Sequence, residues 1–174
     1  MKLVSNLRRA GVIAALGLAL AACASVARLD AGGDIHAFLV SIRNGDRGAF
    51  DAHVDRPALK EQLHARLMTE AKKQGGDLAA LGASLLRPLV DVAADQLVQP
   101  DVFRAVAENL GYSADAPLPD RLTIASALRP LDGDHVCIPR PKGGRCLLVF
   151  RNEGGVWRLI DFEGDLSLLR PPHR

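Results

Sequence analysis

The chain has 174 residues, of which 48% are hydrophobic and 24% charged, and its formal charge is +2 at pH 7. Three of the 22 Lys and Arg residues, and none of the 20 acidic residues, lie within residues 1–22, so the rest of the chain carries 19 cations and 20 anions. These charges are mixed in sign and form no basic block interleaved with aromatic residues, which argues against a nucleic-acid partner.

The first 22 residues have the pattern of an export signal, with cations at Lys2, Arg8 and Arg9. A thirteen-residue apolar stretch follows and closes with Leu-Ala-Ala-Cys at positions 20–23. This stretch is shorter than the roughly 20 apolar residues of a membrane-spanning helix. A cysteine directly after small residues fits lipoprotein processing. We therefore predict a signal peptide at 1–22 and acylation of Cys23 with fatty acids such as palmitate, which would anchor the protein in a lipid membrane.

Ordinary secretory cleavage after Ala24 is the alternative, because Ala22-Cys23-Ala24 also has the small-x-small pattern of a cleavage site. Position 24 is not the Asp that commonly retains bacterial lipoproteins at the inner membrane, which favours the outer membrane. The expected location is the bacterial periplasm, with the protein anchored to lipid.

The 152 residues that follow residue 22 are enough for one compact domain. Residues 23–33 are mostly small and end in a glycine pair, and we predict a tether there that spans at most about 35 Å over its last ten residues. A single domain is predicted at 34–169. Residues 170–174, which contain two prolines, are predicted to be a frayed tail.

The first two thirds of the domain are predicted to form about five helices, because apolar residues recur at helical spacing between capping residues. The predicted helices begin near Asp34, Asp46, Asp55, Asp77 and Pro100. They end near Gly45, Val54, Gly75, Val92 and Leu110. Asp34, Asp46 and Asp55 are the candidate N-caps of the first three helices.

Short apolar runs separated by turn residues follow, as is typical of antiparallel strands joined by hairpins. The predicted strands are Leu122–Leu128, His135–Ile138, Cys146–Arg151 and Val156–Phe162. Helices followed by consecutive strands imply an α+β domain in which helices cover one face of a four-stranded antiparallel meander.

Two of the three cysteines flank the second predicted hairpin. A four-residue loop at 140–143 would place Cys137 and Cys146 directly opposite one another, within reach of a disulfide. In an oxidising compartment we expect a structural disulfide. The alternative, a redox or metal-binding pair, lacks both a close two-residue cysteine spacing and a set of His and Cys partners.

Candidate chemistry is sparse. The five histidines are scattered without the i, i+4 spacing of a helical metal site, and we predict no metal and no cofactor. Asp51, His53 and Asp55 form the densest polar trio and could serve as an acid/base group. The competing interpretation is structural, with Asp55 as a helix cap and the other two residues on the solvent side of a short helix. We favour that interpretation and predict no catalytic residue.

A possible binding surface lies on the predicted sheet. Leu148 and Phe150 lie on one face of their strand and Leu147 and Val149 on the other, so the strand is either covered on both faces or borders an apolar concavity. Trp157 shares a face with a leucine, which favours core packing, with ligand stacking as the alternative. If the concavity exists, the candidate ligand-facing residues are Leu148, Phe150 and Trp157.

The order of these motifs resembles an uncharacterised bacterial family, domain-of-unknown-function family 2939. The resemblance is carried by Ile35–Ala71, in which Gly45-Asp46 separates two helices and Val-Asp-Arg-Pro-Ala-Leu at 54–59 opens a leucine-rich helix. The Gly-x-Trp-x-Leu pattern at 155–159 adds to it. The resemblance implies an exported or membrane-anchored protein with helices before a C-terminal sheet. It implies no activity, cofactor or catalytic residue.

The leading hypothesis from the sequence is a non-enzymatic periplasmic lipoprotein whose domain binds an envelope protein or an apolar small molecule near the membrane. Two alternatives stay open. One is a hydrolase-like enzyme that uses Asp51, His53 and Asp55, and the other is a purely structural component of the envelope.

Overall fold

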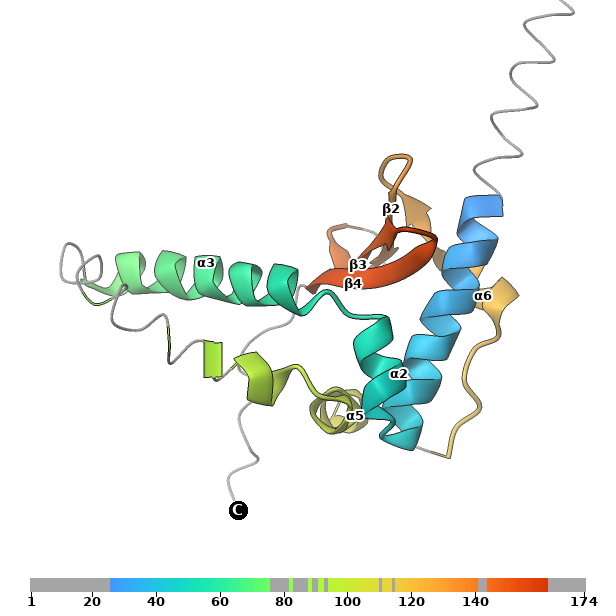
Figure 1. Ribbon diagram of the computed structural model, residues 1–174, viewed down its shortest axis with the longest axis horizontal. Helices are drawn as coiled ribbons and strands as arrows, with labels where there is room; N and C mark the ends of the chain where they lie inside the picture. Colours follow the sequence, from blue (N-terminus) through green and yellow to red (C-terminus); the bar gives the residue numbers. More distant parts are fainter. Residues whose placement is uncertain are drawn as a thin grey trace, which may run out of the picture.

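The computed structural model describes residues 26–75, 82, 88, 91–92, 94–109, 111–113, 115–140 and 144–162. Its helices are an unlabelled first helix at 26–44, α2 (Arg47–Ala52), α3 (Arg56–Gly75), α5 (Pro100–Asn109) and α6 (Arg121–Ala127). Its strands are β1 (Arg129–Pro130), β2 (His135–Pro139), β3 (Cys146–Glu153) and β4 (Val156–Phe162). Helices therefore precede the sheet, and the predicted α+β class is confirmed (Figure 1).

Several predictions concern residues that the structure does not describe. The signal peptide, Cys23 and the tail at 170–174 lie outside the described residues, and so does most of the helix predicted from Asp77 to Val92. Within the described part, no helix is both long enough and apolar enough to cross a bilayer.

The sheet is an antiparallel meander in the order β1-β2-β3-β4. Its last three strands coincide with predicted strands and extend some of them by one or two residues. The register shifts between Val149 and Phe150 on β3, where Phe150 pairs with Leu159 and Val149 pairs with Asp161. One face of the sheet packs against the helices, so the predicted covering of a sheet face by helices is also observed.

The strand predicted at Leu122–Leu128 is wrong, because residues 121–127 form α6 and Leu128 is the C-cap of this helix. The side chain of Asp120 caps this helix by accepting a hydrogen bond from the backbone N–H of Thr123 at 2.7 Å. Ile124 and Leu128, four residues apart, are buried on one side of the helix, whereas Leu122 is 61% exposed. The alternation of Leu122 and Ile124 suggested a strand, but the burial follows the helical period.

The tether predicted at 23–33 is wrong for residues 26–33, which belong to the first helix. Ala31 is fully buried in the core. A Cβ atom on Gly32 would lie 2.4 Å from the backbone oxygen of Arg121, so this glycine lets α6 approach the helix closely. Asp34 is consequently not a cap. Its Oδ2 atom accepts a hydrogen bond from the backbone N–H of Trp157 at 2.8 Å and ties the helix to β4.

The other predicted caps are confirmed. The Asp46 side chain accepts from the N–H of Ala49 at 3.0 Å at the start of α2, and Asp55 accepts from the N–H of Ala58 at 2.9 Å at the start of α3. Gly45 has a φ of 67° between the first two helices, a conformation that glycine adopts without strain. The sequence therefore correctly predicts the helix boundaries between residues 44 and 56.

The cap at Asp46 gives a first prediction. Asp46→Ala should lower the free energy of unfolding by about 1 kcal/mol, because the N–H of Ala49 loses its acceptor. Asp46→Asn should retain most of the stability, since asparagine caps helices about as well as aspartate. Urea denaturation of the three proteins measures the differences. Equal losses for both variants would show that the carboxylate charge, rather than the capping bond, stabilises α2.

Aromatic side chains dominate the core. Rings from the first helix, α2, α5 and β3 lie 5.3–6.0 Å apart between centroids and meet mostly edge to face, a favourable arrangement for aromatic pairs. These residues are Phe38, Phe50, Phe103 and Phe150. Trp157 and Leu159 of β4 belong to the same cluster. The core therefore joins the helices to the sheet.

The connection between α2 and α3 pairs with the edge of the sheet. Val54 forms an isolated parallel bridge with Leu159. The Leu159 N–H donates to the His53 carbonyl oxygen at 2.9 Å, and the Asp55 N–H donates to the Leu159 carbonyl oxygen at 3.0 Å. These bonds fix residues 53–55 against β4.

The predicted disulfide joins Cys137 of β2 to Cys146 of β3, with Cα atoms 5.6 Å apart. The expectation that the two residues are directly opposite is wrong, because Cys137 pairs with Val149 and Cys146 pairs with Pro139. A register shift between Ile138 and Pro139 moves the strands relative to the simple hairpin. The disulfide therefore links diagonal positions across the hairpin.

Candidate functional site

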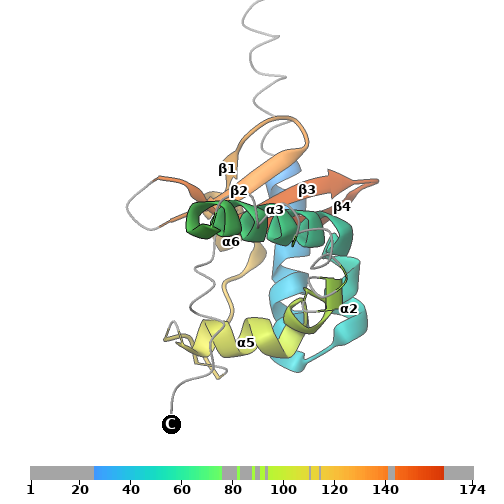
Figure 2. The same cartoon turned by 90° about the vertical axis from the view of Figure 1, so that its left-hand side faces the viewer.

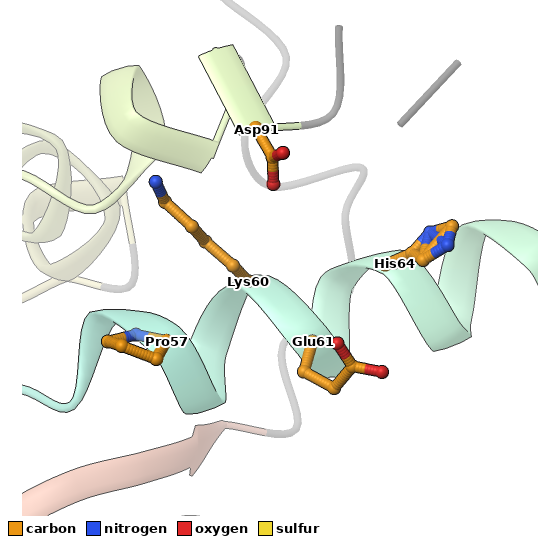
Figure 3. Close-up of a pocket in the computed structure, with 5 residues that line it drawn as sticks. All are labelled: Pro57, Lys60, Glu61, His64 and Asp91. Atoms are coloured by element: carbon orange, nitrogen blue, oxygen red, sulfur yellow. The ribbon is translucent and has the colours of Figure 1, made fainter. Parts of the chain in front are cut away.

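An open hollow of about 350 Å³ lies beside the first half of α3 (Figure 3). It is lined by Pro57, Lys60, Glu61, His64 and Asp91. Figure 3 shows the Lys60 side chain extending from α3 toward the segment that carries Asp91. The lining is mainly polar and holds both signs of charge, so the hollow suits a polar or charged group better than an apolar ligand.

Two cations beside the hollow, Lys60 and Arg56, form ion pairs with carboxylates of the protein. The Lys60 ammonium lies 2.8 Å from Oδ1 of Asp95 and donates a hydrogen bond to Oδ2 at 2.9 Å. The Arg56 guanidinium lies 4.0 Å from Asp95 and donates to Oδ1 of Asp51 at 2.6 and 3.0 Å. The resulting series of ion pairs connects α2, α3 and the helical stretch at 94–97.

The Lys60 hydrogen bond is the main reason that the pKa of Asp95 lies below its ordinary value of 3.8. A lowered carboxyl pKa stabilises the fold above the unfolded-state pKa, and this contribution is lost as the pH falls through the folded-state value. Lys60→Met should therefore raise the Asp95 pKa, whereas Lys60→Arg should keep it low because the cation remains. Carboxyl ¹³C NMR titration measures both. An unchanged pKa in Lys60→Met would mean that the bond is not formed in solution.

His64 carries the unpaired polar group of the hollow. Its Nδ1 atom is buried and, among the described residues, has no hydrogen-bond partner. The described residues contain no group of three or more His, Cys, Asp or Glu side chains placed to hold a metal ion. The hollow thus offers polar contacts and lacks an assembled set of catalytic partners in this part of the chain.

The trio Asp51, His53 and Asp55 lies where α2 joins α3, and its members have separate partners. Asp51 is bound to Arg56, and Asp55 caps α3 through one oxygen while its other oxygen accepts from Arg151 at 2.8 Å. His53 is the C-cap of α2, and its buried Nδ1 has no partner among the described residues. The expected role of Asp55 as a cap is confirmed. The structure does not bring the trio together as a hydrogen-bonded acid/base group.

Asp55 belongs to a second ion-pair cluster on the sheet. Arg151 of β3 also donates to Glu153, whose other oxygen lies 3.6 Å from Arg158 of β4. The hydrogen bond with Glu153 raises the pKa of Arg151 above its ordinary value. This cluster connects the start of α3 to two strands, which is a structural role.

Two of the three candidate ligand-facing residues are in the closed core. Phe150 is 0% exposed and Trp157 is 2% exposed, and the Phe150 ring packs against Phe38 of the first helix at 5.9 Å. Leu148 is partly buried against the same core. The favoured interpretation of Trp157 as a core residue is therefore confirmed, whereas a ligand-facing concavity at Phe150 and Trp157 is wrong, because both side chains are buried in the core between the helices and the sheet.

The sequence did not indicate the pairs Lys60–Asp95 and Arg151–Asp55, whose members lie 35 and 96 residues apart. The i, i+4 spacing of Arg56 and Lys60 does signal a basic edge on α3. No pattern in the neighbouring sequence indicates that Lys60 pairs with Asp95.

Residues 12–106 match a family described as protein of unknown function (DUF2939). The chain belongs to the DUF2939 family. The resemblance seen in the helical motifs is thereby confirmed. The DUF2939 match covers the trio and the hollow and ends before β1, so it does not extend to the sheet. No curated protein and no solved structure matches the chain. Membership of DUF2939 therefore assigns no activity to the site.

Proposed function

We propose that this DUF2939 protein is a periplasmic lipoprotein, acylated at Cys23, whose α+β domain binds a protein partner at the outer membrane. The observation that carries the proposal is the Leu-Ala-Ala-Cys run at 20–23, which follows a basic segment and a short apolar stretch. Several acyl chains on one cysteine would hold the domain stably at the membrane.

The fold supports a membrane-proximal domain. The first helix begins by residue 26, and three residues of extended chain span at most about 10 Å. An acylated Cys23 would therefore hold the folded domain within about 10 Å of the anchor, whereas the ten-residue tether predicted from the sequence could extend to about 35 Å.

The described contacts favour binding of a protein over catalysis and over an apolar small molecule. The carboxylates of Asp51 and Asp55 are each held by an arginine, which favours structural roles for both. Phe150 and Trp157, the rings that could have stacked on an apolar ligand, are buried by the protein itself. Ion-paired polar surface, such as that around Lys60 and Asp95, is the kind of surface that forms the rim of protein interfaces.

Cys23→Ala tests the anchor. The wild-type protein should fractionate with membranes, dissolve in detergent and carry acyl mass on its N-terminal peptide. Cys23→Ala should leave the membrane fraction, whereas the neighbouring substitution Ser25→Ala should have no effect. A wild-type N-terminus at Ser25 without acyl mass, or membrane association of Cys23→Ala equal to that of the wild type, would overturn the proposal in favour of ordinary secretion or another mode of attachment.

A second experiment separates a binding domain from the hydrolase alternative. Asp51→Asn, His53→Gln and Asp55→Asn together remove the acid/base groups, while asparagine at position 55 keeps the helix cap. If the domain binds a protein, the triple variant should crosslink in cells to the same partners as the wild type. It should also restore the growth of cells that lack the protein as well as the wild type does. Loss of this restored growth at unchanged thermal stability and unchanged crosslinking would support an enzyme instead.

A further inference from the structure

The start of the first helix and the β1–β2 loop, residues 131–134, lie at the same end of the domain. Figures 1 and 2 share their vertical axis, and in both views these two segments are at the top of the described structure, while α2 and α5 are at the bottom. Each segment presents an exposed aliphatic side chain. Val26 is 57% exposed and Leu131 is 48% exposed.

The distance from the anchor decides what this end can contact. Val26 is three residues from Cys23, a reach of at most about 10 Å. The headgroup layer of one leaflet is about 5–8 Å thick, the difference between the total bilayer and its hydrocarbon core divided between two sides. An acylated Cys23 would thus hold the top of the domain within or directly against the headgroups.

We propose that this end of the domain is a lipid-contact surface, formed by Val26 and the β1–β2 loop, that lies on the bilayer into which Cys23 is acylated. This inference rests on the proposed lipid anchor. The two exposed aliphatic side chains would enter the interfacial layer, where burial of apolar area favours contact.

Hydrogen bonds within the β1–β2 loop fix its conformation. The Asp132 carboxylate accepts hydrogen bonds from the Asp134 N–H at 2.9 Å and from Nδ1 of His135 at 2.7 Å. The Leu131 N–H donates to the His135 carbonyl oxygen at 3.0 Å and closes the turn. Because the loop also carries the exposed Asp134, zwitterionic headgroups suit it better than a strongly anionic surface.

The contact also orients the domain. The first helix has 19 described residues and is about 28 Å long, so α2 and α5 at its other end point away from the bilayer. A soluble protein partner would reach that end without obstruction from the membrane.

Depth measurements test this surface. The acylated protein, with Cys137 and Cys146 in their disulfide, is reconstituted into vesicles of the zwitterionic lipids phosphatidylethanolamine and phosphatidylcholine. Single cysteines at Leu131→Cys, Leu122→Cys or Tyr112→Cys carry an environment-sensitive fluorophore, and lipids with a nitroxide near the headgroup quench it. Leu122 is a matched leucine, 61% exposed on α6, and Tyr112 is 70% exposed just after α5.

Quenching should be several-fold stronger at position 131 than at position 112, with position 122 between them. Similar quenching at all three positions, in protein that co-sediments with the vesicles, would overturn the lipid-contact surface and leave the anchor intact. If the purified protein lacks acyl mass and none of the variants co-sediments, the anchor itself is wrong, and the surface falls with it. Unlabelled Leu131→Asp supplies a check without the fluorophore: amide hydrogen exchange in residues 131–135 should be slowed by vesicles in the wild type and less so in this variant.

Discussion

Phe150→Ala is expected to lower the free energy of unfolding by about 3–5 kcal/mol, which is a large part of the stability of an ordinary domain. The Phe150 side chain is fully buried where β3 meets the first helix, and its ring packs edge to face on Phe38. Truncation removes this contact and leaves a cavity that fixed neighbours on a helix and a sheet cannot fill.

Urea denaturation followed by the fluorescence of Trp157, the single tryptophan, measures this loss. Phe150→Leu is the matched control, because it keeps most of the apolar volume and should cost less than half as much. Val149→Ala on the adjacent, half-buried position should also cost less. A small effect of Phe150→Ala would show that the helix does not close over the sheet, which would reopen the possibility of an apolar concavity there.

The parts of the fold that the sequence predicted are those set by neighbouring residues. Asp46 and Asp55 cap helices through bonds to N–H groups three residues ahead, and such caps are visible in a short stretch of sequence. The β3–β4 hairpin is equally local, because Gly154 and Gly155 both adopt positive φ between apolar strands. The α+β class followed from these local patterns.

The segment at 122–128 shows where such patterns become ambiguous. Apolar residues at 122, 124 and 128 satisfy both an alternating and a helical spacing over so short a range. The Asp120 cap and the burial of Ile124 and Ala125 beside the first helix select the helix. The first helix and α6 are about 90 residues apart in the sequence, so a local pattern cannot show that they pack against each other.

The candidate site was less predictable than the fold. The trio Asp51, His53 and Asp55 stood out because its members are close in sequence, yet Asp55 has its ion-pair partner, Arg151, 96 residues away. In the same way, the apolar character of β3 on both faces could not reveal which face the first helix covers. Chemistry that depends on long-range neighbours needs the folded structure, and family membership adds no assigned activity here.

Gly32→Ala and Gly33→Ala should change stability in opposite directions, although the two glycines are adjacent in one helix. Alanine is favoured over glycine in a helix by about 1 kcal/mol. At position 33 a Cβ atom meets nothing within 4 Å, so Gly33→Ala should raise the free energy of unfolding by about 0.5–1 kcal/mol.

At position 32 a Cβ atom would lie 2.4 Å from the backbone oxygen of Arg121 and 3.1 Å from Cβ of Ala125. Backbone cannot move aside as the end of a flexible side chain can, so α6 must shift and Gly32→Ala should lose about 1–3 kcal/mol despite the gain in helix propensity. Urea denaturation of the two single variants gives both signs. The pair discriminates between two descriptions of residues 26–33: in a flexible tether, alanine at either position would have a similarly small effect, whereas opposite signs require a helix packed closely on α6.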